Sequence, residues 1–360
     1  MPILIYNAMK SRIISFICFM LFAALSVFAS KIKYYDKNDN IEYDSIPYMV
    51  NAPTFEKSYR ELLEMFDEKI PYSLKRAEFL VENAFYDDTM DYDKFCHDID
   101  SIVNVLNRFI DVNNFRRYKT APNFAIFEYF TKSSIMNGNR RFSYDFDDPM
   151  GQKEFSIFFV SRLIKTHKGP CTSMPLLYKI LCDELGGHSA LAFGPMHLYI
   201  KHIGEDGRWV NVELTHGGFV RDVWMMETMN ISTEAIRNGI FMCALSKKET
   251  IGFMLMQLAR AYQRKYNSYD FFVEQCINSV LCQLPSFCDA LVLKLNLYKD
   301  QGNKFKAKYG DGYRPYLHRH HQEYMKIVGV LDSLGYSQPT IEEYNAQVTK
   351  GLEFTKKETL

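Results

Sequence analysis

Residues 169–187 read GPCTSMPLLYKILCDELGG, which is the pattern of an apolar helix that begins at a cysteine. The apolar side chains recur at helical spacing until the pattern stops at Gly186-Gly187, and they are Met174, Leu176, Leu177, Ile180, Leu181 and Leu185. Cys171 is therefore expected on the first turn of this helix. Unpaired backbone N–H groups and the positive end of the helix dipole there lower the pKa of a thiol.

Three strand-like runs follow the helix, at residues 189–193, 197–203 and 208–214. The helix carries the chain away from Cys171 and the first strand carries it back. After the turn at Gly194-Pro195, His197 therefore begins the second strand near the cysteine.

The third strand is expected to return antiparallel to the second, about a hairpin turn at Gly204–Gly207. This pairing places Glu213 opposite His197 or one diagonal away on the same face. A thiol, an imidazole and a carboxylate then converge, in the roles of nucleophile (Cys171), base and orienter.

These residues resemble the transglutaminase-like branch of the papain-like cysteine enzymes. The pattern of that branch is Gly-x-Cys on a helix, His on the next strand region, and an acid after a tryptophan; here it reads Gly169-Pro170-Cys171, His197, and Glu213 after Trp209. The layout is similar to SirB1-type proteins, with helices before the Cys helix and tetratricopeptide-like helices after the sheet. Two departures are Glu213, where the family has Asp, and Leu198-Tyr199 in place of Ala-Trp.

The resemblance implies an α+β fold and a catalytic triad of Cys171, His197 and Glu213, with no metal and no organic cofactor. Each residue also has an alternative interpretation. A cysteine can be a buried structural residue, a histidine can be held by core hydrogen bonds, and Asn211 or Asp206 could orient the imidazole instead of Glu213.

His318 and His321 could share one face of a helix, and the neighbouring residues are Arg319 and His320. Two ligands make a poor metal site, so a solvated helix face is the interpretation that we adopt.

The composition indicates a globular protein that has no broad basic surface. Lys plus Arg and Asp plus Glu number 43 each among the 360 residues, which argues against nucleic acid as a partner. The chain is long enough for two or three domains.

The N-terminus has the pattern of a signal peptide over residues 1–29. Lys10 and Arg12 precede an apolar run from Ile13 to Phe28, and Val27-Phe28-Ala29 fits a cleavage site before Ser30. We expect export to the periplasm or the extracellular space, with no stable membrane insertion after cleavage. The alternative is an uncleaved N-terminal anchor.

Cleavage would remove Cys18 and leave seven cysteines, so at least one thiol stays free. Cys276, Cys282 and Cys288 lie in helical patterns among apolar neighbours, where buried small side chains are expected.

The sequence predicts helices on both sides of the core. The N-terminal helical region spans 30–150; it begins with an extended leader at 31–50, and four helices follow. The core at 151–245 opens with a helix, and a tetratricopeptide-like region spans 246–360. The predicted helices are 54–66 with Thr54 as N-cap, 73–85, 92–110, 120–135, 151–165, 249–266, 269–284, 286–301, 316–334 and 340–352. The last region holds too few repeats to fold alone, so it should pack on the core.

Two functions are compatible with these patterns. The leading one is an exported cysteine-dependent acyl-transfer enzyme that hydrolyses an amide in a peptide or protein substrate. The other is a non-catalytic peptide- or protein-binding module that keeps the fold and uses its C-terminal helices for a protein partner. The triad favours the enzyme.

Overall fold

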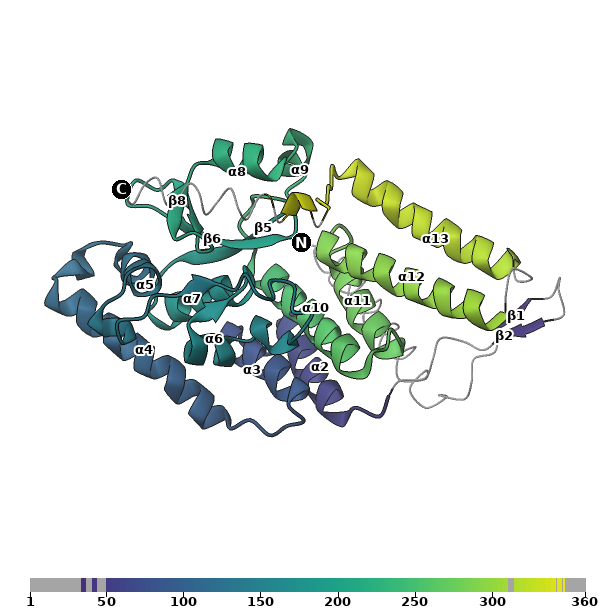
Figure 1. Ribbon diagram of the computed structural model, residues 1–360, viewed down its shortest axis with the longest axis horizontal. Helices are drawn as coiled ribbons and strands as arrows, with labels where there is room; N and C mark the ends of the chain where they lie inside the picture. Colours follow the sequence, from purple (N-terminus) through teal and green to yellow (C-terminus); the bar gives the residue numbers. More distant parts are fainter. Residues whose placement is uncertain are drawn as a thin grey trace, which may run out of the picture. The chain divides into compact units, whose positions relative to one another are not determined.

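The computed structural model describes residues 34–36, 41–43, 50–309, 314–340, 342–344 and 346 (Figure 1). The expected signal peptide at 1–29 lies outside these residues. The chain divides into two compact units, Met1–Tyr48 and Met49–Leu360. The described residues of the first unit form an antiparallel pair of strands, β1 (Tyr34–Asp36) and β2 (Ile41–Tyr43), within the predicted extended leader.

The second unit is mixed α+β, with many helices and a small antiparallel sheet. Its N-terminal helices are α2 (Pro53–Phe66), α3 (Leu74–Phe85), α4 (Tyr92–Val112), η1 (Phe115–Arg117), α5 (Ala121–Thr131) and η2 (Ile135–Asn137). Its C-terminal helices are α10 (Lys247–Tyr266), α11 (Phe271–Gln283), α12 (Cys288–Tyr309) and α13 (Arg314–Ser333).

Between these two groups lies the region that holds the sheet. A short parallel pair, β3 (Ser143–Tyr144) and β4 (Lys168–Gly169), flanks the helices η3 (Phe155–Phe158) and α6 (Val160–Thr166). The segments that follow are α7 (Ser173–Glu184), β5 (Ser189–Gly194), β6 (His197–Ile203), β7 (Trp209–Glu213), β8 (Gly218–Val220), α8 (Asp222–Met229) and α9 (Thr233–Arg237).

The four strands β5-β6-β7-β8 lie in sequence order and are antiparallel throughout. Helix α7 covers one side of this sheet, and α8 and α9 cover the other (Figure 1). Because side chains alternate along a strand, Leu191 and Ile200 join the core beneath α7, whereas Ala192 and Tyr199 pack with α8 and α9. The three-strand hairpin pattern predicted from sequence is confirmed, and β8 adds a fourth strand that it did not predict.

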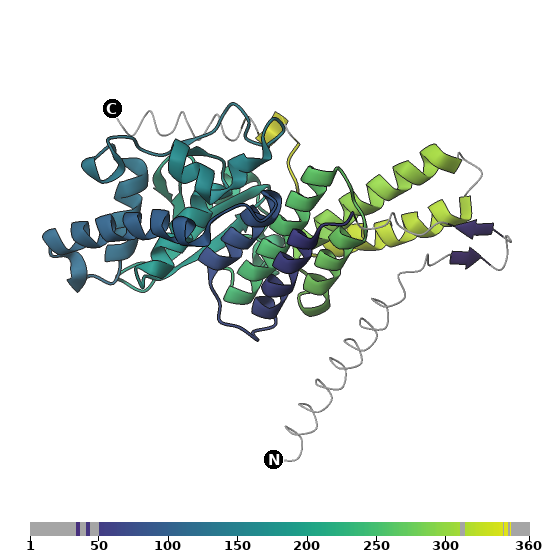
Figure 2. The same cartoon turned by 90° about the horizontal axis from the view of Figure 1, so that it is seen from below.

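Helix α10 lies between the N-terminal and the C-terminal helices of the second unit. It packs against α2 and α3 as well as α11 and α12, and Figure 2 shows the purple N-terminal helices against the green C-terminal ones. Leu255, Met256 and Leu258 are fully buried there, within one apolar cluster that extends from α2 to α12. Helices α10, α11 and α12 are therefore part of the core of this unit.

Several predicted helix bounds were wrong. The single helix expected over 151–165 is broken into η3 and α6, because Glu78 and Glu82 of α3 accept hydrogen bonds from the N–H groups of Val160 and Ser161 (3.2 and 3.0 Å) and start a new helix there. The helix expected over 120–135 ends at Thr131.

Thr54 does not cap α2. Pro53 takes the first helical turn, so Ala52 occupies the cap position. Ser73, by contrast, caps α3 by accepting a hydrogen bond from the Arg76 N–H. Of the helix expected over 340–352, only residues 342–344 and 346 are described, and they are helical.

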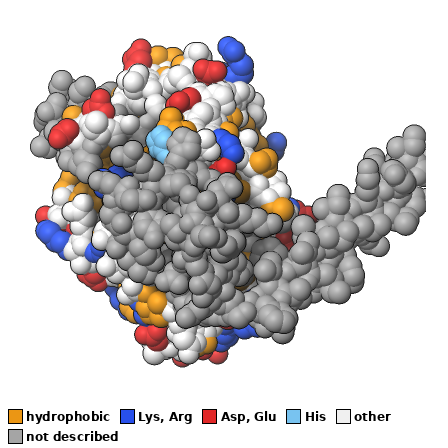
Figure 3. All heavy atoms as spheres, turned by 90° about the vertical axis from the view of Figure 1, so that its right-hand side faces the viewer, with side chains coloured by type: hydrophobic (Ala, Val, Ile, Leu, Met, Phe, Trp, Pro, Cys, Tyr) orange, Lys and Arg blue, Asp and Glu red, His pale blue; other side chains and the backbone are white. Residues whose placement is uncertain are grey.

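On the face shown in Figure 3, Lys and Arg side chains are interspersed with Asp and Glu side chains among the described residues, in keeping with their equal numbers. Within the described part of the chain, no helix is both long enough and apolar enough to cross a bilayer.

Candidate active site

Cys171 lies just before helix α7 rather than on its first turn. The helix begins at Ser173, with Thr172 in the cap position, so the helix N-terminus is further along the chain than predicted. Gly169 is required at the approach, because a Cβ there would collide with the Ser173 hydroxyl. Cys171 is only 7% exposed.

His197 and Glu213 lie together at one end of the sheet. The β6–β7 register pairs Ile200 with Val212, which sets Glu213 one diagonal away from His197, on the same face. The His197 Nε2–H donates to Glu213 Oε2 at 2.5 Å. Both side chains are buried, with 8% and 2% exposed.

A threonine fixes the second oxygen of the carboxylate. The Thr215 N–H and hydroxyl both donate to Glu213 Oε1, at 2.9 and 2.8 Å. The carboxylate is therefore held by three hydrogen bonds, which orient Oε2 toward the imidazole.

Burial and mutual attraction compete at this pair, and attraction dominates. Burial disfavours charge on each group, but the Glu213 carboxylate, together with Cys171, raises the pKa of His197 to about 10. In the same way, burial is outweighed by His197, His216 and Thr215, and the pKa of Glu213 falls to about 2. At neutral pH the pair is an imidazolium and a carboxylate.

The Cys171 thiol has a lowered pKa. Burial opposes this shift, but the hydrogen bond and positive charge of His197 outweigh burial, with smaller contributions from the Tyr344 hydroxyl and the Leu198 N–H. Since Nε2 of His197 is bound to Glu213, Nδ1 is left for the sulfur. Of the helix N-terminus and the imidazole that the sequence suggested, His197 makes the largest identified contribution that lowers this pKa.

The other candidate orienters do not contact His197. The Asn211 amide donates to the Val220 carbonyl and to Asp222 Oδ1, and Asp206 is engaged by Arg208 in the hairpin turn. Among the three acids and amides considered from sequence, Glu213 is the one that the structure places on the imidazole.

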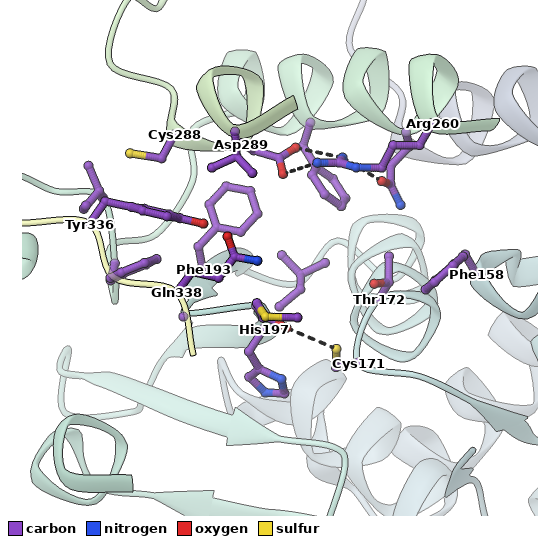
Figure 4. Close-up of a pocket in the computed structure, with 18 of the residues that line it drawn as sticks. Phe158, Cys171, Thr172, Phe193, His197, Arg260, Cys288, Asp289, Tyr336 and Gln338 are labelled. Carbon is purple, nitrogen blue, oxygen red and sulfur yellow. Dashed lines mark hydrogen bonds and ion pairs between the residues drawn. The ribbon is translucent and has the colours of Figure 1, made fainter. Parts of the chain in front are cut away.

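A cavity of about 330 Å³ opens on Cys171 and His197 (Figure 4). Most of its walls are apolar, and they include Phe155, Phe158, Phe193, Ile240, Phe253 and Val292. The wall opposite Cys171 belongs to α10 and α12, and it carries an ion pair in which Arg260 donates to both oxygens of Asp289 at 3.0 and 2.5 Å. Gln257 accepts a further hydrogen bond from Arg260 at 3.1 Å. The C-terminal helices α10 and α12 therefore form one wall of the cavity.

Comparison with known proteins does not identify a family for this chain. No family model matches the chain, and no curated protein matches it. Among solved structures it has a weak likeness to menin, whose structure is described as revealing the binding site for Mixed Lineage Leukemia (MLL) protein. The sequence identity is 10%, 86% of this chain and 90% of that chain are covered, and the TM-score is 0.28. A likeness of this size carries no weight for fold or function.

The described cysteines are all free thiols: Cys96, Cys171, Cys182, Cys243, Cys276, Cys282 and Cys288. Cys276 is buried as expected. The prediction was wrong for Cys282, which is exposed because it falls on the outer face near the end of α11, and for Cys288, which is half-buried at the start of α12. Burial raises the pKa of Cys182 to about 11 and that of Cys288 to about 12, opposite to the shift at Cys171.

No group of three or more His, Cys, Asp or Glu side chains is placed to hold a metal ion among the described residues. His318 and His321 lie on α13 as expected, and the His318 side chain is outside the described part.

Sequence reasoning missed three features of the site. Thr215 and the Arg260–Asp289 pair had no recognisable motif, although Thr215 follows a strand that ends in a buried acid. Tyr344 was also missed, and its hydroxyl lies 3.7 Å from the Cys171 sulfur. A lone tyrosine 173 residues away in sequence gives no local signal.

Replacing Glu213 by glutamine should neutralise His197. In Glu213→Gln the new amide oxygen can keep the hydrogen bonds from Thr215, which turns the NH₂ group toward Nε2. That nitrogen must then be an unprotonated acceptor. The pKa of His197 should fall from about 10 toward its ordinary value of about 6.5, because the Cys171 thiol remains to raise it while the carboxylate is gone.

Imidazole ¹H–¹⁵N NMR across a pH titration measures this shift. Glu205→Gln, in an exposed turn where the carboxylate contacts Thr120, is the matched control and should leave His197 unchanged. An unaltered His197 titration in Glu213→Gln would show that the carboxylate does not hold the charge.

Proposed function

We propose that this protein is an exported, cysteine-dependent acyl-transfer enzyme with a transglutaminase-like core, and that it hydrolyses an amide in a peptide or protein substrate. The observation that carries the proposal is the buried His197–Glu213 pair, whose free imidazole nitrogen is left for the thiol of Cys171. A nucleophile, a base and an orienting carboxylate in this order are the parts that thiol-based acyl transfer needs.

The chemical steps follow from the charge state of the three residues. The Cys171 thiolate attacks the amide carbonyl carbon, and the oxyanion that forms is held in part by the Cys171 N–H. The C–N bond then breaks as His197 gives its proton to the leaving amine, which leaves a thioester on Cys171. His197 next takes a proton from water and the hydroxide attacks the thioester carbonyl. The C–S bond then breaks, the acyl group leaves as a carboxylic acid, and the thiolate and imidazolium are restored. Glu213 stabilises the imidazolium before and after each transfer.

The cavity supports an apolar acyl group as the part of the substrate next to the thiol. Its phenylalanine-rich wall favours burial of apolar or aromatic side chains. The Arg260–Asp289 pair is neutral as a whole, so it adds hydrogen-bonding groups without net charge. We therefore propose a substrate whose acyl side carries an apolar residue.

A non-catalytic binding module is the second candidate function. The low exposure of Cys171 and a cavity partly walled by the C-terminal helices favour it, because a bound segment could occupy the cavity without chemistry. The shifted pKa values of Cys171, His197 and Glu213 favour the enzyme, since ligand binding alone does not require an activated thiol.

Export rests on the Lys10–Ala29 pattern alone. N-terminal sequencing of the protein recovered from a bacterial periplasm should begin at or near Ser30. Recovery of the intact N-terminus from the cytoplasm would end this part of the proposal.

Alkylation mapped by peptide separates the two functions. Iodoacetamide at pH 6–7 should modify Cys171 faster than Cys182 or Cys276, because burial raises the pKa of the latter two. The exposed Cys282 is the control for access, and Cys171 should react faster than it does despite being buried. Uniformly slow labelling of the buried thiols, with Cys282 labelled first, would leave only the binding module.

A further inference from the structure

One tyrosine hydroxyl contacts the Cys171 sulfur, and a second tyrosine hydroxyl contacts the first. The Tyr344 hydroxyl lies 3.7 Å from the sulfur and 2.7 Å from the Tyr144 hydroxyl. Both tyrosines are almost fully buried, with 3% and 2% of their surface exposed. We call Tyr144 and Tyr344 the tyrosine pair.

The tyrosine pair is brought together by the short parallel sheet. The register pairs Tyr144 of β3 with Gly169 of β4, and Gly169 precedes Cys171 by two positions in the sequence. The pairing therefore brings Tyr144 close to Cys171. Tyr344 comes from the C-terminal segment that follows α13, 200 residues from Tyr144. The contact therefore ties the segment that carries Tyr344 to the candidate nucleophile.

The direction of these hydrogen bonds is fixed once the thiol has lost its proton. A thiolate only accepts hydrogen bonds, so the Tyr344 O–H must donate to sulfur, and the Tyr144 O–H must then donate to the Tyr344 oxygen. Both hydroxyls are available as donors, because burial raises the pKa of each tyrosine far above neutrality.

We propose that the tyrosine pair stabilises the thiolate of Cys171 through a two-step hydroxyl chain, which makes the C-terminal segment carrying Tyr344 a working part of the active site. Tyr344 touches the reacting sulfur itself, whereas Tyr144 acts through Tyr344 and is a positioning residue. This inference rests on the proposed function, since it assumes that the thiolate is the reacting form of Cys171.

The alternative is that Tyr344 blocks the thiol. Cys171 lines the cavity whereas neither tyrosine does, so the sulfur is open to the cavity while the tyrosine pair stays in place. The hydroxyl contact is therefore compatible with substrate access.

Few other ionisable groups face the sulfur. His197 approaches from β6, and Glu213 acts on the sulfur through His197. Asp145, next to Tyr144, is paired with Lys168 at 3.3 Å. Removing one tyrosine hydroxyl therefore leaves the charges of His197 and Glu213 in place. The effect of that hydroxyl on the reactivity of Cys171 can then be measured separately.

The pH dependence of Cys171 alkylation tests the proposal. In Tyr344→Phe the inflection of the iodoacetamide rate profile should move upward by about one pH unit, with a roughly tenfold slower rate below it and convergence with the wild type at high pH. Tyr144→Phe should move it in the same direction by less, because it removes only the second donor. Tyr129→Phe, a buried tyrosine that packs against Phe142, is the matched control and should leave the profile unchanged.

Melting temperatures should first confirm that the variants are folded, and each possible alkylation profile then has one interpretation. An unchanged profile in Tyr344→Phe overturns the tyrosine-pair proposal and leaves the proposed function intact. Faster labelling at every pH overturns it in favour of a blocking role. A wild-type Cys171 that reacts like an ordinary buried thiol would instead remove the proposed function itself, and the inference with it.

Discussion

His197→Ala should alkylate at Cys171 on the order of 100-fold more slowly than the wild type at pH 6, and the two rates should converge only as the pH approaches the raised pKa of the variant's thiol. An ordinary thiol has a pKa of about 8.5 and is almost fully protonated at pH 6, where only the thiolate reacts. His197 is the residue that outweighs burial at Cys171, both by its hydrogen bond and by its charge. Without it, burial is left to raise the pKa of the thiol.

The matched control is His202→Ala, since His202 lies on the same strand and is buried, but its imidazole hydrogen-bonds the Ile203 carbonyl instead. Peptide mapping after timed iodoacetamide exposure gives both rates, and thermal melting shows whether each variant is folded. Wild-type labelling in His197→Ala would mean that the thiolate is stabilised by other groups.

A chain truncated after Leu245 should fail to fold. It loses α10, whose buried side chains pack against α2 and α3, and which include Ile251, Phe253, Met254, Leu255, Met256, Leu258 and Tyr262. Burying each large side chain contributes about 1.5–3 kcal/mol, so several of them together exceed the roughly 5–15 kcal/mol net stability of a domain. The truncated protein should be insoluble or melt without cooperativity.

Two further variants make this test specific. A chain ending at Ala346 keeps every described contact of the second unit and should fold normally. Leu255→Ala, at a fully buried position, should cost about 2–5 kcal/mol of unfolding free energy in denaturant titration. A soluble, cooperatively melting chain that ends at Leu245 would show instead that the helices are an independent module.

The local parts of the site could be predicted from the sequence because their geometry is local. Helix, turn and hairpin lengths between Cys171 and Glu213 decide where the three residues lie, and the observed diagonal between His197 and Glu213 is one of the two registers expected. No contact with a distant segment was needed for that inference.

What the sequence did not predict depends on contacts between distant segments. The break before α6 comes from Glu78 and Glu82, about 80 residues earlier, which supply partners for backbone N–H groups that the periodicity of 151–165 cannot show. Tyr344 reaches Cys171 from 173 residues away. The fourth strand, β8, is only three residues long, too short for a recognisable alternation.

Trapping of an acyl-enzyme tests the central claim most directly. The protein is mixed with p-nitrophenyl phenylacetate, an activated ester whose aromatic acyl group suits the cavity, and p-nitrophenolate release is followed together with the mass of the Cys171 peptide. We expect a burst of p-nitrophenolate equal to the enzyme present, with one phenylacetyl group on Cys171, no burst in Cys171→Ala, and a much slower burst in His197→Ala. Absence of acylation at Cys171 in the wild type, or acylation of the exposed Cys282 at the same rate, would contradict the account.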